Sequence, residues 1–97
     1  MNLVISNLAQ QDLAAIEKYT RDKWGVHQAD IYLEQIQAKV FSLLEQPYLG
    51  TTRADISSGY RCLQEGKHLI FYYLEQEAIN IIGIPHSRMD LKKHLEL

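Results

Sequence analysis

Apolar positions in the first half of the chain form one short continuous run and then two patterns at helical spacing. Residues 3–5 read as a first strand. Two stripes at helical spacing follow. The first contains Ala9, Leu13 and Ile16, widened by Leu8, Ala15 and Tyr19, and the second contains Ala29, Tyr32, Leu33, Ile36, Val40, Leu43 and Leu44. The pattern therefore predicts a strand followed by two helices.

The ends of these helices carry recognisable signals. Asn7 is the expected N-cap of the first helix, with Gln10 completing a capping box. Gly25 ends that helix, and Pro47 ends the second. Because only a few residues around Gly25 separate the helices, we expect an antiparallel helical hairpin.

The second half of the chain predicts an antiparallel sheet. Residues 47–59 are rich in Gly, Ser and Thr and read as a loop. Three strands are expected at residues 60–64, 67–74 and 78–84, joined by turns at Glu65-Gly66 and at residues 75–77. Ser87 and Asp90 resemble a capping box for a short last helix with Leu91 and Leu95 on one face. The predicted fold is α+β, a single domain over residues 1–97 in which an N-terminal strand and an antiparallel helical hairpin precede an antiparallel sheet and a short C-terminal helix.

The middle strand of this sheet is apolar on both faces. Its residues divide into Leu69, Phe71 and Tyr73 on one face and Ile70, Tyr72 and Leu74 on the other, and the last strand repeats the division with Ile82 and Ile84 against Ile79 and Ile81. The helical hairpin can cover only one face. Two alternatives remain: either the loop and the C-terminal segment cover the second face, or part of it stays exposed and receives a partner.

Composition narrows the classes of function. The net charge of −2 argues against a general nucleic-acid binder, although basic residues can still cluster locally. The single cysteine, Cys62, excludes an internal disulfide and fits a reducing cytoplasm. Neither a signal peptide nor a membrane span is apparent, and no pattern predicts a cofactor or a metal site.

A few polar residues are candidates for chemistry. His86 and Arg88, together with Arg61, form a possible phosphate-binding site with a general acid or base, which would suit RNA cleavage; the alternative is a histidine in a local cap. His68 is interpreted as an exposed strand residue. Arg53 and Asp55 are expected to pair within the loop, and Trp24 is either a packing residue or an exposed binding residue.

The order and spacing of many short pieces resemble the ParE branch of the ParE/RelE toxin superfamily over nearly the whole chain. The matching pieces are Ala9, Asp12-Leu13, Ile16, Tyr19, Trp24-Gly25, Tyr32, Ile36, Leu44, Pro47, Gly50, Arg53, Asp55-Ile56, Gly59-Tyr60-Arg61, residues 68–72, Ile82, His86, Arg88-Met89-Asp90 and His94-Leu95.

This resemblance implies a function and two alternatives. ParE proteins are toxins of bacterial type II toxin–antitoxin systems that trap DNA gyrase with cleaved DNA, block replication and are neutralised by a ParD-like antitoxin. On this basis the chain is expected not to be an enzyme. The first alternative is a RelE-like ribosome-dependent mRNA endonuclease using Arg61, His86 and Arg88; the second is an inactive member that only binds its antitoxin. Against the nuclease, no tyrosine follows Tyr73, and His68 stands where RelE-like nucleases tend to place an arginine.

The resemblance also places the binding surfaces. We expect the target to contact the C-terminal segment through His86, Ser87, Arg88, Met89, Asp90, Lys92, Lys93 and His94. We expect the antitoxin to contact Leu69, Ile70, Phe71, Tyr72, Tyr73, Ile82 and Ile84. A cytoplasmic toxin–antitoxin hetero-oligomer is expected, without membrane association and without direct sequence-specific binding of nucleic acid.

Overall fold

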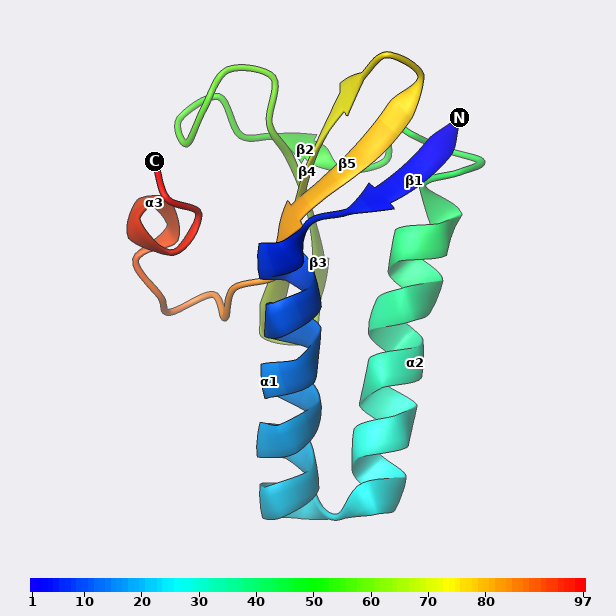
Figure 1. The fold of residues 1–97 in the computed structure, drawn as a ribbon, viewed down its shortest axis with the longest axis vertical. Helices are drawn as coiled ribbons and strands as arrows, with labels where there is room; N and C mark the ends of the chain where they lie inside the picture. Colours follow the sequence, from blue (N-terminus) through cyan, green and yellow to red (C-terminus); the bar gives the residue numbers. More distant parts are fainter.

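Two long antiparallel helices pack against one face of a five-stranded sheet in the computed structural model, which describes residues 1–97 (Figure 1). In chain order the elements are β1 (Asn2–Ile5), α1 (Asn7–Trp24), α2 (Val26–Ser42), β2 (Thr51–Thr52), β3 (Arg61–Glu65), β4 (His68–Glu75), β5 (Ala78–Gly83) and α3 (Leu91–His94). The predicted α+β class and order of elements are confirmed. No helix is long and apolar enough to cross a membrane.

The sheet contains two pairings that the pattern of residues did not predict. Its strand order is β1-β5-β4-β3-β2. β1 lies parallel to β5, whereas the other neighbours are antiparallel. Thr51 and Thr52, assigned to a loop, pair with Cys62 and Arg61 as the short edge strand β2. The two edge strands, β1 and β2, therefore come from before and after the helical hairpin, and they flank the three central strands.

The first hairpin turn is shifted by one residue from the prediction, and the second is one residue shorter. Glu65 pairs with His68, so the first turn is Gly66-Lys67 and not Glu65-Gly66. Gly66 has φ +56°, a backbone conformation that glycine adopts without steric cost. In the second turn Gln76 and Glu77 both have positive φ, at 54° and 58°, as a two-residue type I′ turn requires.

Both predicted N-caps were wrong, the first by one residue and the second by three. The N-cap of α1 is Ser6, whose Oγ accepts a hydrogen bond from the Ala9 amide at 3.0 Å and donates one to the Ile82 carbonyl at 2.6 Å. The cap of α3 is Asp90, which accepts from the Lys93 amide at 3.2 Å. Ser6 is the N-cap in place of Asn7, because its side chain also forms a hydrogen bond that connects the start of the helix to β5.

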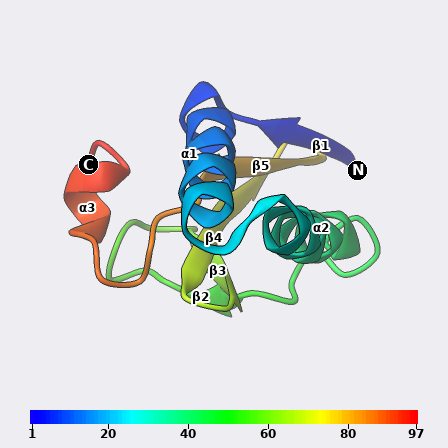
Figure 2. The ribbon, with the colours of Figure 1, turned by 90° about the horizontal axis from the view of Figure 1, so that it is seen from below.

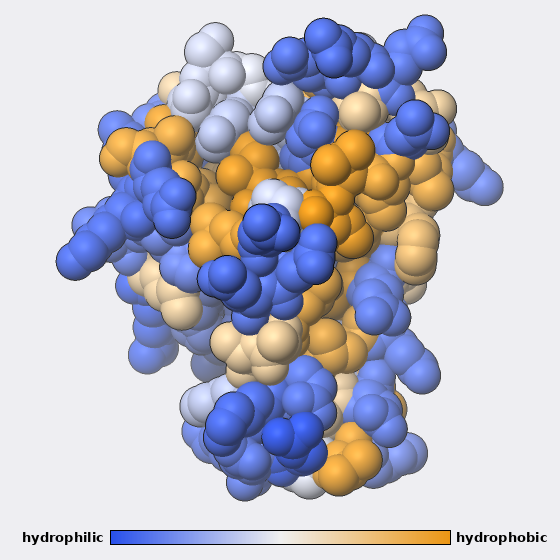
Figure 3. Space-filling view, in the orientation of Figure 1, coloured by the Kyte–Doolittle hydropathy of each residue, from blue (hydrophilic) through white to orange (hydrophobic).

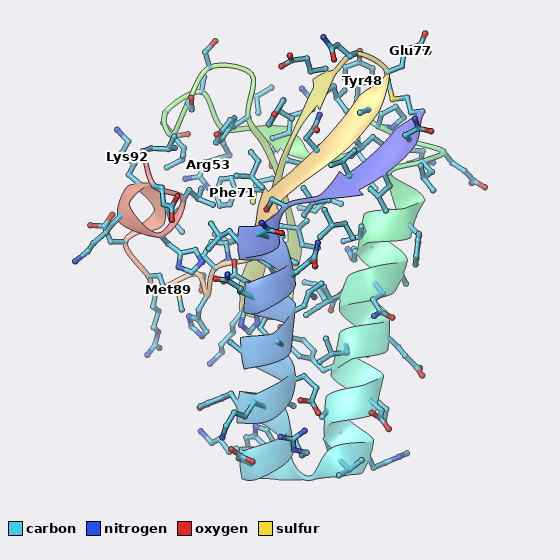
Figure 4. All side chains as sticks on the ribbon, in the orientation of Figure 1. Tyr48, Arg53, Phe71, Glu77, Met89 and Lys92 are labelled. Atoms are coloured by element: carbon cyan, nitrogen blue, oxygen red, sulfur yellow. The ribbon has the colours of Figure 1, made fainter.

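Two apolar clusters lie on the two faces of the sheet. The larger one joins the helical hairpin to the face of Ile70 and Tyr72, with Ile36 and Leu43 from the α2 side. The smaller one contains Cys62, Phe71 and Leu95, with Leu8, Ile56, Tyr60, Leu69, Ile82 and Leu91 packed against it. Figure 4 shows Phe71 beside Arg53 of the loop, between the sheet and α3. The loop and the C-terminal segment therefore cover the second face of the sheet around Phe71, which confirms the first alternative there.

The C-terminal helix α3 lies on the opposite side of α1 from α2 (Figure 2). Its anchors are Leu95, which is buried, and His94, whose ring contacts Asp12 of α1. Gly83 makes this approach possible: an added Cβ there would lie 2.7 Å from Leu95 Cδ2. The C-terminal segment, which was expected to contact the target, is therefore docked on the domain.

Candidate functional site

A groove of about 640 Å³ opens between the free end of the helical hairpin and the β3–β4 turn. Its walls come from the last turns of α1, the first turns of α2, the β3–β4 turn and the segment after β5. The lining residues are Tyr19, Thr20, Lys23, Trp24, Gln28, Ile31, Tyr32, Gln35, Gly66, Lys67, His68, His86 and Arg88. The groove is thus built from four parts of the chain that are distant in sequence.

Two histidines face each other in this groove. The centroids of the His68 and His86 rings lie 5.3 Å apart, with the ring planes at 80°. Backbone hydrogen bonds from Leu69 to Pro85 at 2.9 Å and from Ser87 to Lys67 at 2.7 Å hold the two strands of chain together. His68 is half-buried, so its interpretation as an exposed strand residue was wrong.

The two histidines have different hydrogen-bond partners at Nδ1. The Tyr32 hydroxyl lies 3.0 Å from the Glu65 carbonyl and 2.6 Å from His68 Nδ1; if its proton goes to the carbonyl, His68 Nδ1 is the donor in the second contact. The lone pair of His68 is then on Nε2. His86 Nδ1 accepts from the Arg88 amide at 3.1 Å, which leaves its proton on Nε2. One ring can accept a proton while the other donates one.

Burial, followed by the charge of His86, lowers the pKa of His68 below its ordinary value. The neutral imidazole is therefore favoured at neutral pH. A neutral base next to a ring that can donate a proton is the combination that general acid–base catalysis requires. It is also a pair that can bind an anion when one ring is protonated.

The predicted group of Arg61, His86 and Arg88 is not assembled. His86 and Arg88 line the groove, but Arg61 lies at the other end of β3, four residues from the Glu65–His68 pair, which is about 13 Å along a strand. Its guanidinium packs over the Tyr48 ring at 5.2 Å and donates to the Tyr48 carbonyl at 3.3 Å. His68, which the sequence reading set aside, takes the place expected for Arg61.

The expected target-binding segment is only partly available to a partner. Ser87, Arg88, Met89, Lys92 and Lys93 are exposed. Asp90 caps α3, and His94 is held against Asp12 at 2.9 Å, so these two stabilise the segment. Figure 4 shows Met89 and Lys92 at the surface beside α3.

The expected antitoxin-binding residues divide in the same way. Ile70, Phe71 and Tyr72 are 0% exposed and Ile84 is 2% exposed, so none of the four is at the surface of the folded chain. Leu69, Tyr73 and Ile82 are partly exposed. Other apolar side chains lie at the surface where α2 ends and β1 runs: Val4, Phe41, Leu44 and Leu49. In the orientation of Figure 1, hydrophobic surface extends across the centre of the molecule and toward its upper right (Figure 3).

Two other expectations, for the Arg53–Asp55 pair and for Trp24, can be compared with the structure. Arg53 and Asp55 pair at 3.0 Å, as predicted. Trp24 is 64% exposed, which favours the exposed alternative. Cys62 is buried, which raises the pKa of its thiol.

Comparisons with known proteins agree with this fold. A family model described as the ParE toxin of the type II toxin–antitoxin system parDE matches residues 3–91. The chain is 36% identical to a protein named Toxin ParE1 in Mycobacterium tuberculosis over 93 residues, 95% of each chain. It is 33% identical to Toxin ParE1 of Caulobacter vibrioides over 91 residues, 94% of each. A solved structure titled "Chromosomal ParDE TA system from P. aeruginosa" superposes with a TM-score of 0.78 at 23% identity, covering 89% of this chain and 95% of that one.

Proposed function

Because the chain belongs to the family of ParE toxins of type II toxin–antitoxin systems, we propose that it inhibits DNA gyrase and thereby blocks replication. The observation that carries the proposal is the near full-length likeness to proteins named ParE toxins. The exposed side chains of the C-terminal segment supply a plausible contact surface. In the cytoplasm such an activity would arrest growth.

Three exposed residues of this segment have the chemistry of a binding surface. Arg88 can pair with a carboxylate or phosphate in a bidentate manner, and Met89, 48% exposed, can fill an irregular apolar contact. Lys92 presents its ammonium group to solvent on α3. Since α3 is docked through Leu95 and His94, the segment can offer these side chains in a fixed geometry, which lowers the entropic cost of binding.

We further propose that a ParD-like antitoxin neutralises the toxin by covering its apolar surface. Leu69, Tyr73 and Ile82 give it an entry on the second face of the sheet, and β1 is an edge strand with one unpaired side. Ile70, Phe71, Tyr72 and Ile84 become accessible only if the elements that cover them move. An apolar segment that folds on binding would suit such a surface.

The test uses purified gyrase, relaxed or supercoiled plasmid and the full chain. We expect lost supercoiling or accumulated cleaved DNA, which the antitoxin reverses. The double variant Arg88→Ala/Met89→Ala should lose most of this inhibition, whereas Lys39→Gln, a cation of α2 outside the segment, should retain it. Removing residues 85–97 is not a suitable variant, because it takes Leu95 away from Phe71 and uncovers the second cluster.

The mRNA endonuclease remains the second candidate because His68 and His86 face each other in the groove beside Arg88 and Lys67. Programmed ribosomes test it. Cuts in mRNA that disappear in His68→Ala and His86→Ala, with gyrase unaffected, would replace the gyrase proposal by the nuclease. If neither gyrase nor mRNA responds while the antitoxin still binds, the chain is an antitoxin-binding member without toxin activity.

A further inference from the structure

The groove between the helical hairpin and the β3–β4 turn is lined by positive charge, whereas the whole chain is negatively charged. Lys23, Lys67 and Arg88 line it, and no Asp or Glu does. The four ion pairs of the structure lie elsewhere and involve none of these three cations. The chain as a whole carries a net charge of −2. A local concentration of unpaired positive charge favours an anionic ligand.

The other end of the groove is aromatic. Tyr19 and Trp24 of α1 are 60% and 64% exposed and belong to neither apolar cluster. Lys23 Nζ lies 5.5 Å from the centroids of both rings, so a cation contacts the two aromatic side chains at the rim of the groove. Large aromatic side chains that do not pack in a core are typical of binding surfaces.

The two ends fit different parts of one ligand. Lys67, His68, His86 and Arg88 come from the sheet side, whereas Tyr19, Lys23 and Trp24 come from the last turns of α1. The groove can thus hold an anion at the sheet and a flat ring at the helices. Its volume of about 640 Å³ is in the range of pockets that bind small molecules.

We propose that this groove binds a short segment of single-stranded nucleic acid without sequence preference. Phosphates contact Lys67, Arg88 and the Nε2–H of His86, and a base stacks on Trp24. Single strands combine a charged backbone with exposed base faces, which is the combination that cationic, aromatic grooves recognise. A duplex hides those faces, and an acidic peptide offers charge without a ring to stack. Binding is confined to a few phosphates, so it is weak and sensitive to salt.

Trp24 makes a direct measurement possible because it is the only tryptophan of the chain. The probe is an oligothymidylate of eight nucleotides, titrated at low salt against the intrinsic fluorescence of the full-length protein, with no gyrase present. We expect saturable quenching that weakens as salt rises. A poly-glutamate peptide of equal charge and a blunt duplex of equal length should quench several-fold less.

Single substitutions separate the groove from the rest of the surface. Lys67→Gln and Lys23→Gln should each weaken binding several-fold and reduce the slope of log K against log salt by about 0.7, the contribution of one phosphate contact on a single strand. Lys39→Gln, which removes a cation outside the groove, should match the wild type. The proposal is overturned if the oligonucleotide leaves the fluorescence unchanged, if poly-glutamate binds as tightly, or if Lys39→Gln weakens binding as much as Lys67→Gln. Because gyrase is absent from this assay, its result is independent of the proposed function.

Discussion

Asp12 of α1 and His94 of α3 are 82 residues apart in sequence, yet His94 Nε2 lies 2.9 Å from both carboxylate oxygens of Asp12. The same carboxylate accepts a hydrogen bond from the Ile84 amide at 2.7 Å. One buried side chain therefore joins the first helix, the end of β5 and the C-terminal helix. Asp12 lies within the apolar stripe of α1 because its partners are on the sheet side of that helix.

Replacing Asp12 by Ala should destabilise the protein and loosen α3. The change leaves the buried Ile84 amide without an acceptor and removes the partner of His94, so we expect a loss of about 2–4 kcal/mol in the free energy of unfolding. Urea denaturation measures the loss, and hydrogen exchange of residues 91–95 reports on α3. Asp22→Asn, which removes a fully exposed i,i+4 pair with Lys18, should leave both unchanged. Equal effects of the two variants would contradict this assignment.

Replacing Gly83 by Ala should disturb the docking of α3 by crowding the side chain of Leu95. The new Cβ would lie 2.7 Å from Leu95 Cδ2, with Asp12 Oδ2 and Leu8 Cδ2 at 3.4 Å, and overpacking of this kind costs about 1–3 kcal/mol. A double-mutant cycle with Leu95→Ala provides the control, because the smaller residue makes room for the Cβ. The double variant should be more stable than the sum of the single effects predicts. Strict additivity would show that the two residues do not contact each other.

The local order of elements could be predicted from the sequence because it depends on periodicity and turn residues. Gly25, with φ +96°, ends α1 as expected. The predicted stripe forms the core side of α2 from Ala29 to Leu43, whereas Leu44, its last residue, is 41% exposed. The pairing of β1 with β5 and of Thr51-Thr52 with β3 could not be predicted in the same way. These pairings depend on contacts between distant segments and leave little trace in a run of two to four residues.

The site was predicted only in part for the same reason. His86 and Arg88 are close in sequence and do lie together, whereas Arg61, which was expected to join them from an adjoining strand, lies elsewhere. His68 and Tyr32 are 36 residues apart, and only the packing of α2 on the sheet brings them to 2.6 Å. The groove's aromatic end was signalled by Trp24 beside Gly25, but the sequence does not show which face of α1 is left uncovered.

Two substitutions in α2 test the core assignment as a matched pair. Ile36 is 0% exposed and Phe41 is 58% exposed. Ile36→Asp places an unpaired charge in the main cluster and should cost about 4 kcal/mol or more, a large part of the stability of a domain of this size. Phe41→Asp should remain folded with a similar midpoint of thermal unfolding. Circular dichroism during heating distinguishes them, and a cooperative, native-like Ile36→Asp variant would contradict the assignment.

The β4–β5 turn offers a stabilising change. Gln76 and Glu77 both have positive φ, which side chains other than Asn and Gly adopt at a cost. Replacing them by Asn-Gly should raise the free energy of unfolding by about 1 kcal/mol, because this pair is preferred in type I′ turns. Gly66→Ala at the other turn should have the opposite sign, since its φ is +56° and the new Cβ would lie 2.8 Å from Tyr32 Oη. Chemical denaturation measures both, and a destabilised Asn-Gly variant would contradict the turn geometry.

Stability should also fall at mildly acidic pH because of His68. The folded state lowers its pKa, first through burial and then through the charge of His86, which faces it across the groove with Lys67 and Arg88 nearby. The unfolded chain has the ordinary value of about 6.5. Between that value and the lower pKa of the folded state the unfolded chain binds more protons, so the free energy of unfolding decreases as the pH falls below about 6.5 and levels off beneath the folded pKa.

The size of this effect is limited because the ring is only half-buried, and we expect less than about 1 kcal/mol over the window. Urea denaturation between pH 5 and pH 8 measures it. His68→Gln keeps a group that can bond to Tyr32 but cannot titrate, so its profile should be flatter than that of the wild type across this range. His27→Gln is the control, since His27 is exposed on α2 outside the groove and its loss should leave the slope unchanged. If His68→Gln retains the full slope, another group is responsible for the acid sensitivity.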